Sequence, residues 1–229
     1  MSSHARGPSA QITAPTIPGG SGALMASRGG FAGAANVPAY EVSRRRSQPS
    51  GILGMVLFLC AEAMLFAGLI SSYFYLDFRA RAWPPAGMAH PQTLDPSVLT
   101  AVLVATSLPM AVAARRARIL QLRGTVSMIA LALTVQCGYL AYQLHSFVEE
   151  LHTLNPHASA YASAYTALLG LHHAHVLLGV LFDLGLLFWL AIGGLSHYRA
   201  IGVRAVALYW HAINVIAIAV LFTEISPSL

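Results

Sequence analysis

Five apolar runs divide the chain, and they cover residues 50–76, 97–114, 125–147, 159–193 and 205–224. A helix rises ~1.5 Å per residue, so about 20 apolar residues cross the hydrocarbon core of a bilayer. The pattern therefore predicts an all-α fold, an integral membrane bundle of five transmembrane helices. The fourth run is longer than a bilayer requires, so we expect it to be tilted or to project beyond the membrane.

The composition agrees with a membrane protein. Apolar residues make up 56% of the chain and charged residues only 9%, whereas soluble domains carry about 25% charged residues. The net charge of +5 comes from arginine, because the chain contains no lysine. These arginines gather at the ends of the apolar runs, which is typical of a topology signal rather than of a nucleic-acid-binding surface. No nucleic-acid partner is expected.

The arginines also predict the orientation. Eleven of them lie in the N-terminal tail, the loop between the second and third runs, and the loop between the fourth and fifth, whereas the opposite side holds only Arg79 and Arg81. Because positive charge is retained in the cytoplasm, the N-terminus is predicted to be cytoplasmic and the C-terminus outside.

Two regions are expected along the chain. Residues 1–48 are rich in Gly, Ala, Pro and Ser and have no periodic apolar face, which predicts a disordered cytoplasmic tail. Residues 49–229 are expected to form the five-helix membrane domain.

Within that domain, Pro109 is expected to kink the second helix. Glu149, Glu150 and His152 are expected in the loop after the third helix. Cys60 and Cys137 lie inside predicted spans without a CxxC partner, so we expect buried, small apolar side chains rather than a disulfide.

Several polar side chains interrupt the apolar runs, and their depths follow from the helical rise. Glu62 lies ~18 Å above the inner end of its span, and Gln136 lies at a similar height. His172 and His175 lie ~18–24 Å below the outer edge, which is again near the middle of the bilayer. A midplane cluster of Glu62, Gln136, His172 and His175 is therefore predicted.

A second polar group is expected nearer the inner side. Asp183 and His211 lie on adjacent spans at similar depth and are predicted to form a pair, to which Asn214 can contribute. On the fourth helix, Asp183 also continues a stripe at i, i+4, i+7 and i+11 that begins at His172 and runs through Val176 and Gly179.

The histidines suggest a haem or a metal, but their geometry favours neither. His172 and His175 lie on one helix, and the other mid-span histidine, His211, is ~10 Å or more away in depth. A metal would need Glu62 as a third ligand. The simpler interpretation is a buried hydrogen bond between helices, with a proton-linked or lipid-linked role for Glu62 as an alternative. No metal site and no catalytic residue are predicted, and His173 lies off the stripe without an evident role.

Three blocks of residues together resemble a known family. Glu62 is followed by Leu65-Phe66 and then by an aromatic helix end, residues 170–176 read GLHHAHV, and Tyr209-Trp210-His211 opens the last span. In this order and spacing the chain resembles subunit III of the haem-copper respiratory oxidases, in the five-helix bacterial form, over residues 51–226. Departures from the family pattern are His173 in place of glycine, Asn214 in place of aspartate and Ala217 in place of tryptophan.

The resemblance implies a subunit that itself binds no haem or copper. It implies packing against oxidase subunit I, association with subunit II and other respiratory-complex chains, bound phospholipid, and support of proton uptake and of the catalytic centre during turnover. The haem and copper would lie in the partner subunits of a cytochrome c oxidase-type complex, which reduces O2 and translocates protons. The location would be the bacterial cytoplasmic (inner) membrane. Residue by residue, Glu62 would be the buried carboxyl, His172, His175 and His211 the family histidines, and Phe66, Tyr209 and Trp210 motif positions.

Other functions remain open at this stage. The partner could be a nitric oxide reductase or a quinol oxidase instead of a cytochrome c oxidase. A haem-binding membrane anchor and a small transporter with Glu62 as its proton site are alternatives from different classes, although no inverted repeat supports a transporter.

Overall fold

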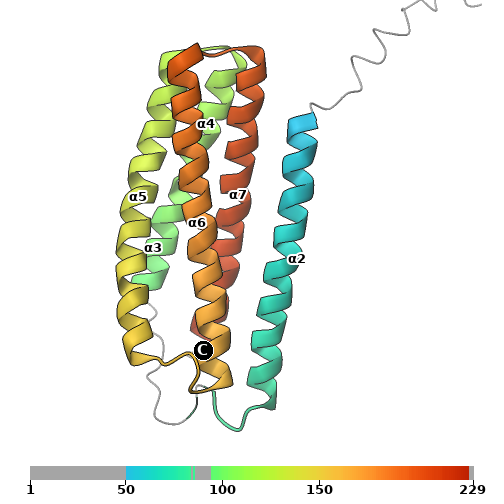
Figure 1. Cartoon of the computed structure of the whole chain (residues 1–229), viewed down its shortest axis with the longest axis vertical. Helices are drawn as coiled ribbons and strands as arrows, with labels where there is room; N and C mark the ends of the chain where they lie inside the picture. The colour runs from blue at the N-terminus through green and yellow to red at the C-terminus, as the bar shows by residue number, and fades with distance from the viewer. Residues whose placement is uncertain (1–49, 84, 86–93, 227–229) are drawn as a thin grey trace, which may run out of the picture. The chain divides into compact units, whose positions relative to one another are not determined.

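The fold is seen in a computed structural model that describes residues 50–83, 85 and 94–226. This part of the chain is helical and contains no strand. Six helices follow one another: α2 (Ser50–Arg79), α3 (Leu94–Ala105), α4 (Ser107–Arg118), α5 (Leu122–Thr153), α6 (Ala160–Gly193) and α7 (His197–Ile225) (Figure 1). Taking α3 and α4 together, five stretches are long and apolar enough to cross a membrane. The predicted all-α fold with five spans is confirmed, while the predicted tail at residues 1–48 lies outside the described residues.

The second span is broken close to Pro109, where the sequence predicted a kink. Pro109 has no N–H group, so it cannot donate to the carbonyl of Ala105, four residues earlier. The helix α3 ends at Ala105, and α4 begins at Ser107. Between them, the Leu103 carbonyl accepts from both the backbone N–H of Thr106 at 3.0 Å and the Thr106 hydroxyl at 2.6 Å.

Two helices extend well beyond their predicted spans. The helix α5 continues to Thr153, so Glu149, Glu150 and His152 are helical rather than in a loop as predicted. Glu149 pairs there with His145 one turn earlier, at 3.6 Å, a spacing that supports helical structure at a polar surface. The helix α7 begins at His197, eight residues before the predicted start, and the Ser196 hydroxyl caps it by accepting from the Arg199 N–H at 3.3 Å.

The helices pack around α7. This helix contacts α2, α3, α4 and α6, and it buries Tyr209, Trp210 and Ile213 completely. The helix α2, by contrast, packs only against α6 and α7 among the described helices and buries few of its own side chains. The polar side chains of α2 that face the bundle can therefore meet only α6 and α7.

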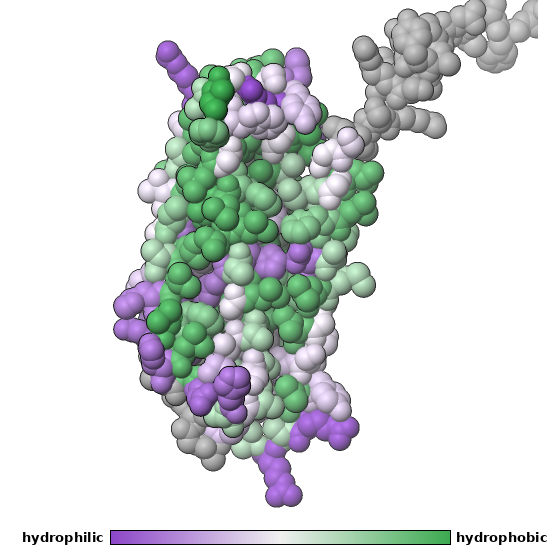
Figure 2. All heavy atoms as spheres, in the orientation of Figure 1, coloured by the Kyte–Doolittle hydropathy of each residue, from purple (hydrophilic) through white to green (hydrophobic). Residues whose placement is uncertain are grey.

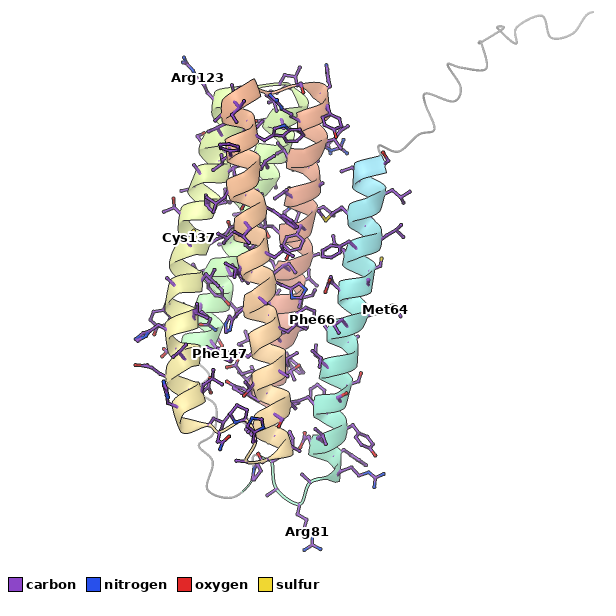
Figure 3. The ribbon with its side chains drawn as sticks, viewed as in Figure 1. Met64, Phe66, Arg81, Arg123, Cys137 and Phe147 are labelled. Atoms are coloured by element: carbon purple, nitrogen blue, oxygen red, sulfur yellow. The ribbon has the colours of Figure 1, made fainter. Side chains whose placement is uncertain are left out.

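The two cysteines lie on the outside of the bundle. Cys60 on α2 and Cys137 on α5 are both exposed and unpaired, and Figure 3 shows Cys137 at the outer side of α5. The prediction that they are buried within the chain is wrong. A helix that is apolar on all sides does not reveal which face its neighbours cover.

Charged side chains gather at the two ends of the helices. Apolar residues cover the middle of the surface in Figure 2, and polar side chains lie mainly above and below them. Figure 3 places Arg123 at the end where α2 begins and Arg81 at the opposite end. The structure thus places Arg123 and Arg81, one from each of the two groups of arginine that the sequence distinguished, at opposite ends.

Candidate functional site

The centre of the candidate site is a contact between Glu62 on α2 and His175 on α6. The Nε2 atom of His175 lies 2.7 Å from Oε2 of Glu62, which is hydrogen-bond distance. Only 9% of the histidine side chain and 18% of the glutamate side chain are exposed. Both residues lie near the middle of their helices, so the contact is far from either end of the bundle.

A second hydrogen bond of His175 restricts its protonation. Its Nδ1 atom lies 2.8 Å from the backbone carbonyl of Leu171. A carbonyl only accepts, so Nδ1 carries the hydrogen. Then Nε2 either accepts a proton held by the Glu62 carboxyl or donates as part of an imidazolium. In both cases one proton lies between Glu62 and His175.

The neighbours of His175 hold it in place. The ring of Phe66, one turn after Glu62 on α2, packs edge-on against the imidazole with ring centres 5.1 Å apart. The Tyr209 hydroxyl on α7 donates to the backbone carbonyl of His175 at 2.7 Å. Figure 3 shows Phe66 between α2 and the bundle, whereas Met64 points away. Residues from all three sequence motifs therefore meet at this contact.

His172 does not join Glu62, although the sequence placed the two residues in one cluster. Its Nε2 atom lies 3.5 Å from the Tyr139 hydroxyl on α5, at the limit of a hydrogen bond, and the side chain is buried. Its Nδ1 atom has no partner among the described residues. His172 thus faces α5 while His175 faces α2, because two positions three residues apart point ~60° apart around a helix.

Gln136 belongs to a different polar group from the one predicted. With its amide oriented so that the nitrogen faces acceptors, Gln136 donates to Oδ2 of Asp183 at 2.9 Å and to the Ala132 carbonyl at 3.3 Å. The Trp210 indole donates to the same Asp183 oxygen at 2.8 Å. All three side chains are buried. The hydrogen bonds of the Asp183 carboxyl therefore link α6 to α5 and to α7.

The predicted pairing of Asp183 with His211 is wrong. Within the described part of the chain, no hydrogen bond or ion pair joins the two residues, and His211 is only partly buried. Depth predicted Asp183 level with His211, and the residue that faces it is the neighbouring Trp210. One step along a helix turns the side chain by ~100°, which carries His211 away from Asp183.

The structure gives His173 an environment but no polar partner. The ring is buried and packs edge-on against Phe147 of α5, with ring centres 5.2 Å apart. Neither ring nitrogen has a hydrogen bond among the residues described. The residue helps to fill the α5–α6 contact.

Two polar contacts were missed by the sequence reasoning. The Asn214 amide donates to the Ser107 hydroxyl at 2.7 Å, beside the break between α3 and α4. The Tyr165 hydroxyl donates to Oε1 of Glu224 at 3.0 Å, near the last turn of α7. The sequence contained a signal for the contact of Glu224, because Glu224 lies 14 residues after Trp210 and therefore on the same face of α7.

Metal-binding side chains do not converge in the described residues. No group of three or more His, Cys, Asp or Glu side chains is placed to hold an ion there. The arrangement can position protons and join helices through buried hydrogen bonds. That this chain carries no metal remains a prediction.

Comparisons with known proteins agree with the three motifs. The family model described as "Cytochrome c oxidase subunit III" matches residues 43–226. The cytochrome c oxidase subunit 3 of Synechocystis sp. is 31% identical over 167 residues, covering 72% of this chain and 70% of the relative. The quinol oxidase subunit 3 of Bacillus spizizenii is 29% identical over 170 residues, covering 72% of this chain and 81% of the relative.

A further relative, the cytochrome c oxidase subunit 3 of a Bacillus species, is 30% identical over 165 residues, covering 72% of this chain and 79% of its own length. The match to the family model extends across all five spans and includes Glu62, the GLHHAHV block and Tyr209-Trp210-His211. The chain therefore belongs to the cytochrome c oxidase subunit III family.

Proposed function

We propose that this chain is the subunit III of a bacterial haem-copper oxidase and that it contains no redox centre of its own. Membership of the family implies association with other oxidase subunits. In this proposal subunit I is the main contact, subunit II and further respiratory chains complete the complex, and haem and copper lie in the partners. The complex reduces O2 and translocates protons in the cytoplasmic membrane.

The observation that carries the proposal is the contact between Glu62 and His175. A carboxyl and an imidazole 2.7 Å apart, with a proton between them, are costly to place in an apolar bundle. Glu62 is also partly accessible from the surface of α2. A proton held there can be exchanged with a neighbouring subunit, so we assign the pair a supporting role in proton uptake.

The proposed roles in lipid binding and in stabilising subunit I rest on the surface of α2. Among the described helices it packs against α6 and α7 alone, and its exposed apolar side chains include Leu53, Leu57, Met64 and Phe78. Such a surface is stable in contact with lipid chains or with another membrane helix. We propose that phospholipid and subunit I share this surface.

The test is Glu62→Gln in the intact oxidase. The amide retains a hydrogen-bonding group of nearly the same shape but cannot exchange a proton, so we expect normal assembly. Proton translocation per electron should fall, or activity should be lost faster during turnover. Both quantities are measured with the oxidase in vesicles. Glu149→Gln, at a glutamate whose side chain is 70% exposed, is the matched control. Unchanged stoichiometry together with an unchanged inactivation rate would reduce Glu62 to a packing role.

A further inference from the structure

A small cavity lies at the end of the bundle where α2 ends and α6 begins. Its polar lining consists of Tyr73 from α2, Tyr165 from α6, and Thr223 and Glu224 from the last turns of α7. The remaining walls are apolar side chains of α6 and α7. The cavity is remote from the contact between Glu62 and His175, which is three turns earlier along α2.

The hydroxyl groups around this cavity differ in whether they have a hydrogen-bond partner. Tyr165 donates its only proton to Oε1 of Glu224 at 3.0 Å, although Glu150 of α5 also interacts with it. Thr223 donates to the backbone carbonyl of Ala219 at 2.9 Å. Neither hydroxyl has a second proton to donate to the other oxygen of the Glu224 carboxyl.

Tyr73 is the exception among these hydroxyls. Only 1% of the residue is exposed, and its hydroxyl is buried without a hydrogen bond to any described residue. Trp83 and Tyr161 pack against its ring, with ring centres 5.3 Å and 6.2 Å away, and Ser226 is also a neighbour. None of the three meets the distance and angle of a hydrogen bond with the hydroxyl. A buried hydroxyl without a partner is destabilising.

The cavity is large enough to supply the missing partner. The space open to the centre of a water molecule amounts to about 10 Å³, which is close to what one water requires. A water there would meet a donor in Tyr73 and an acceptor in Glu224.

We propose that this cavity is a binding site for one water molecule, which accepts a hydrogen bond from Tyr73 and donates one to Glu224. The water connects the end of α2 to α7, and through Tyr165 to α6. It is a second polar connection of α2 to the bundle, independent of Glu62 and His175. The inference does not depend on the proposed oxidase function.

Tyr73→Phe in the native complex tests the proposal through the sign of its effect. If water bridges Tyr73 and Glu224, losing the hydroxyl removes a hydrogen bond, and the midpoint of thermal unfolding of this chain falls. If no water is present, the substitution removes an unpartnered buried hydroxyl, and the midpoint stays the same or rises. Tyr75→Phe is the control, at a tyrosine of the same helix that is 58% exposed.

Density maps of the same complex give the second measurement. We expect one water peak at hydrogen-bond distance from the Tyr73 hydroxyl and the Glu224 carboxyl, and its loss in Tyr73→Phe. An empty cavity together with an unchanged or raised midpoint overturns the proposal. A wild-type midpoint that rises with sodium or potassium concentration, in a manner lost in Tyr73→Phe, identifies a bound cation and overturns it as well.

Discussion

At the scale of single residues, contacts on several sides constrain His175. Its Nδ1 faces the Leu171 carbonyl, its Nε2 faces Glu62, and its own carbonyl accepts from Tyr209. Each contact comes from a different part of the fold. The orientation of the imidazole is therefore fixed on both sides, and the proton between His175 and Glu62 has a defined place.

His175→Leu should destabilise the chain by about 1–3 kcal/mol, because it leaves the buried Glu62 carboxyl without its partner. The double variant Glu62→Leu/His175→Leu should recover much of that loss, since replacing both partners by apolar groups can be nearly neutral. The measurement is the unfolding free energy of the chain in its purified complex. His197→Leu, at an exposed histidine, is the control. A double variant that is less stable than His175→Leu would contradict the pairing.

The residues of this site could be predicted only in part. Depth along the helices predicted Glu62 level with His175, and their side chains meet at 2.7 Å. It also predicted Asp183 level with His211, and the neighbouring Trp210 contacts Asp183. Depth does not give the direction in which a side chain points around its helix axis. That direction decides which neighbouring helix the side chain meets. Hence His172 was grouped with Glu62 although it faces Tyr139, and Asp183 was paired with His211 although Trp210 faces it.

At the scale of helices, the close approach of α6 and α7 depends on Gly179. A Cβ atom at this position would lie 2.7 Å from the nearest ring carbon of Trp210. The Trp210 ring is fully buried and is held by its hydrogen bond to Asp183. It therefore has little freedom to move away.

Gly179→Ala should accordingly destabilise the chain by about 1–3 kcal/mol through overpacking. Gly185→Ala is the matched control, because the same helix offers open space at that position. There the change should be neutral or stabilising by up to about 1 kcal/mol, as expected for alanine against glycine in a helix. Thermal unfolding of both variants in the complex measures the difference. Equal effects would show that the Gly179–Trp210 contact is not tight.

The number of membrane spans and their helical type followed directly from the apolar runs, and the kink predicted at Pro109 lies close to the break between α3 and α4. The helix ends did not follow, because α5 and α7 continue through polar residues such as Glu149 and Arg199. Apolar runs report the thickness of the hydrocarbon region, whereas the helices extend beyond it. The exposed Cys60 and Cys137 show the same limit for helix faces.

At the scale of the whole membrane domain, the separation of arginines predicts orientation. Arg123 lies at the end where α2 begins, and Arg81 lies at the other end (Figure 3). By the positive-inside rule, the Arg123 end should face the cytoplasm. The two ends can be distinguished by labelling with a reagent that does not cross membranes.

The labelling experiment uses single cysteines in a Cys60→Ala/Cys137→Ala background. We expect His157→Cys, in the exposed turn before α6, to react from outside intact cells. Arg123→Cys should react only after the membrane has been opened. The reverse result would invert the predicted orientation.

The central claim is that this chain works as a haem-free and copper-free subunit within a haem-copper oxidase. The most direct measurement is purification of the native complex through this chain, with identification of the co-purifying chains and optical and metal analysis before and after their separation. We predict a partner chain that holds haem and copper, and a separated chain without a Soret band. A complex without a haem-copper partner, or a Soret band that stays with this chain and is lost in His172→Ala or His211→Ala, would contradict the claim.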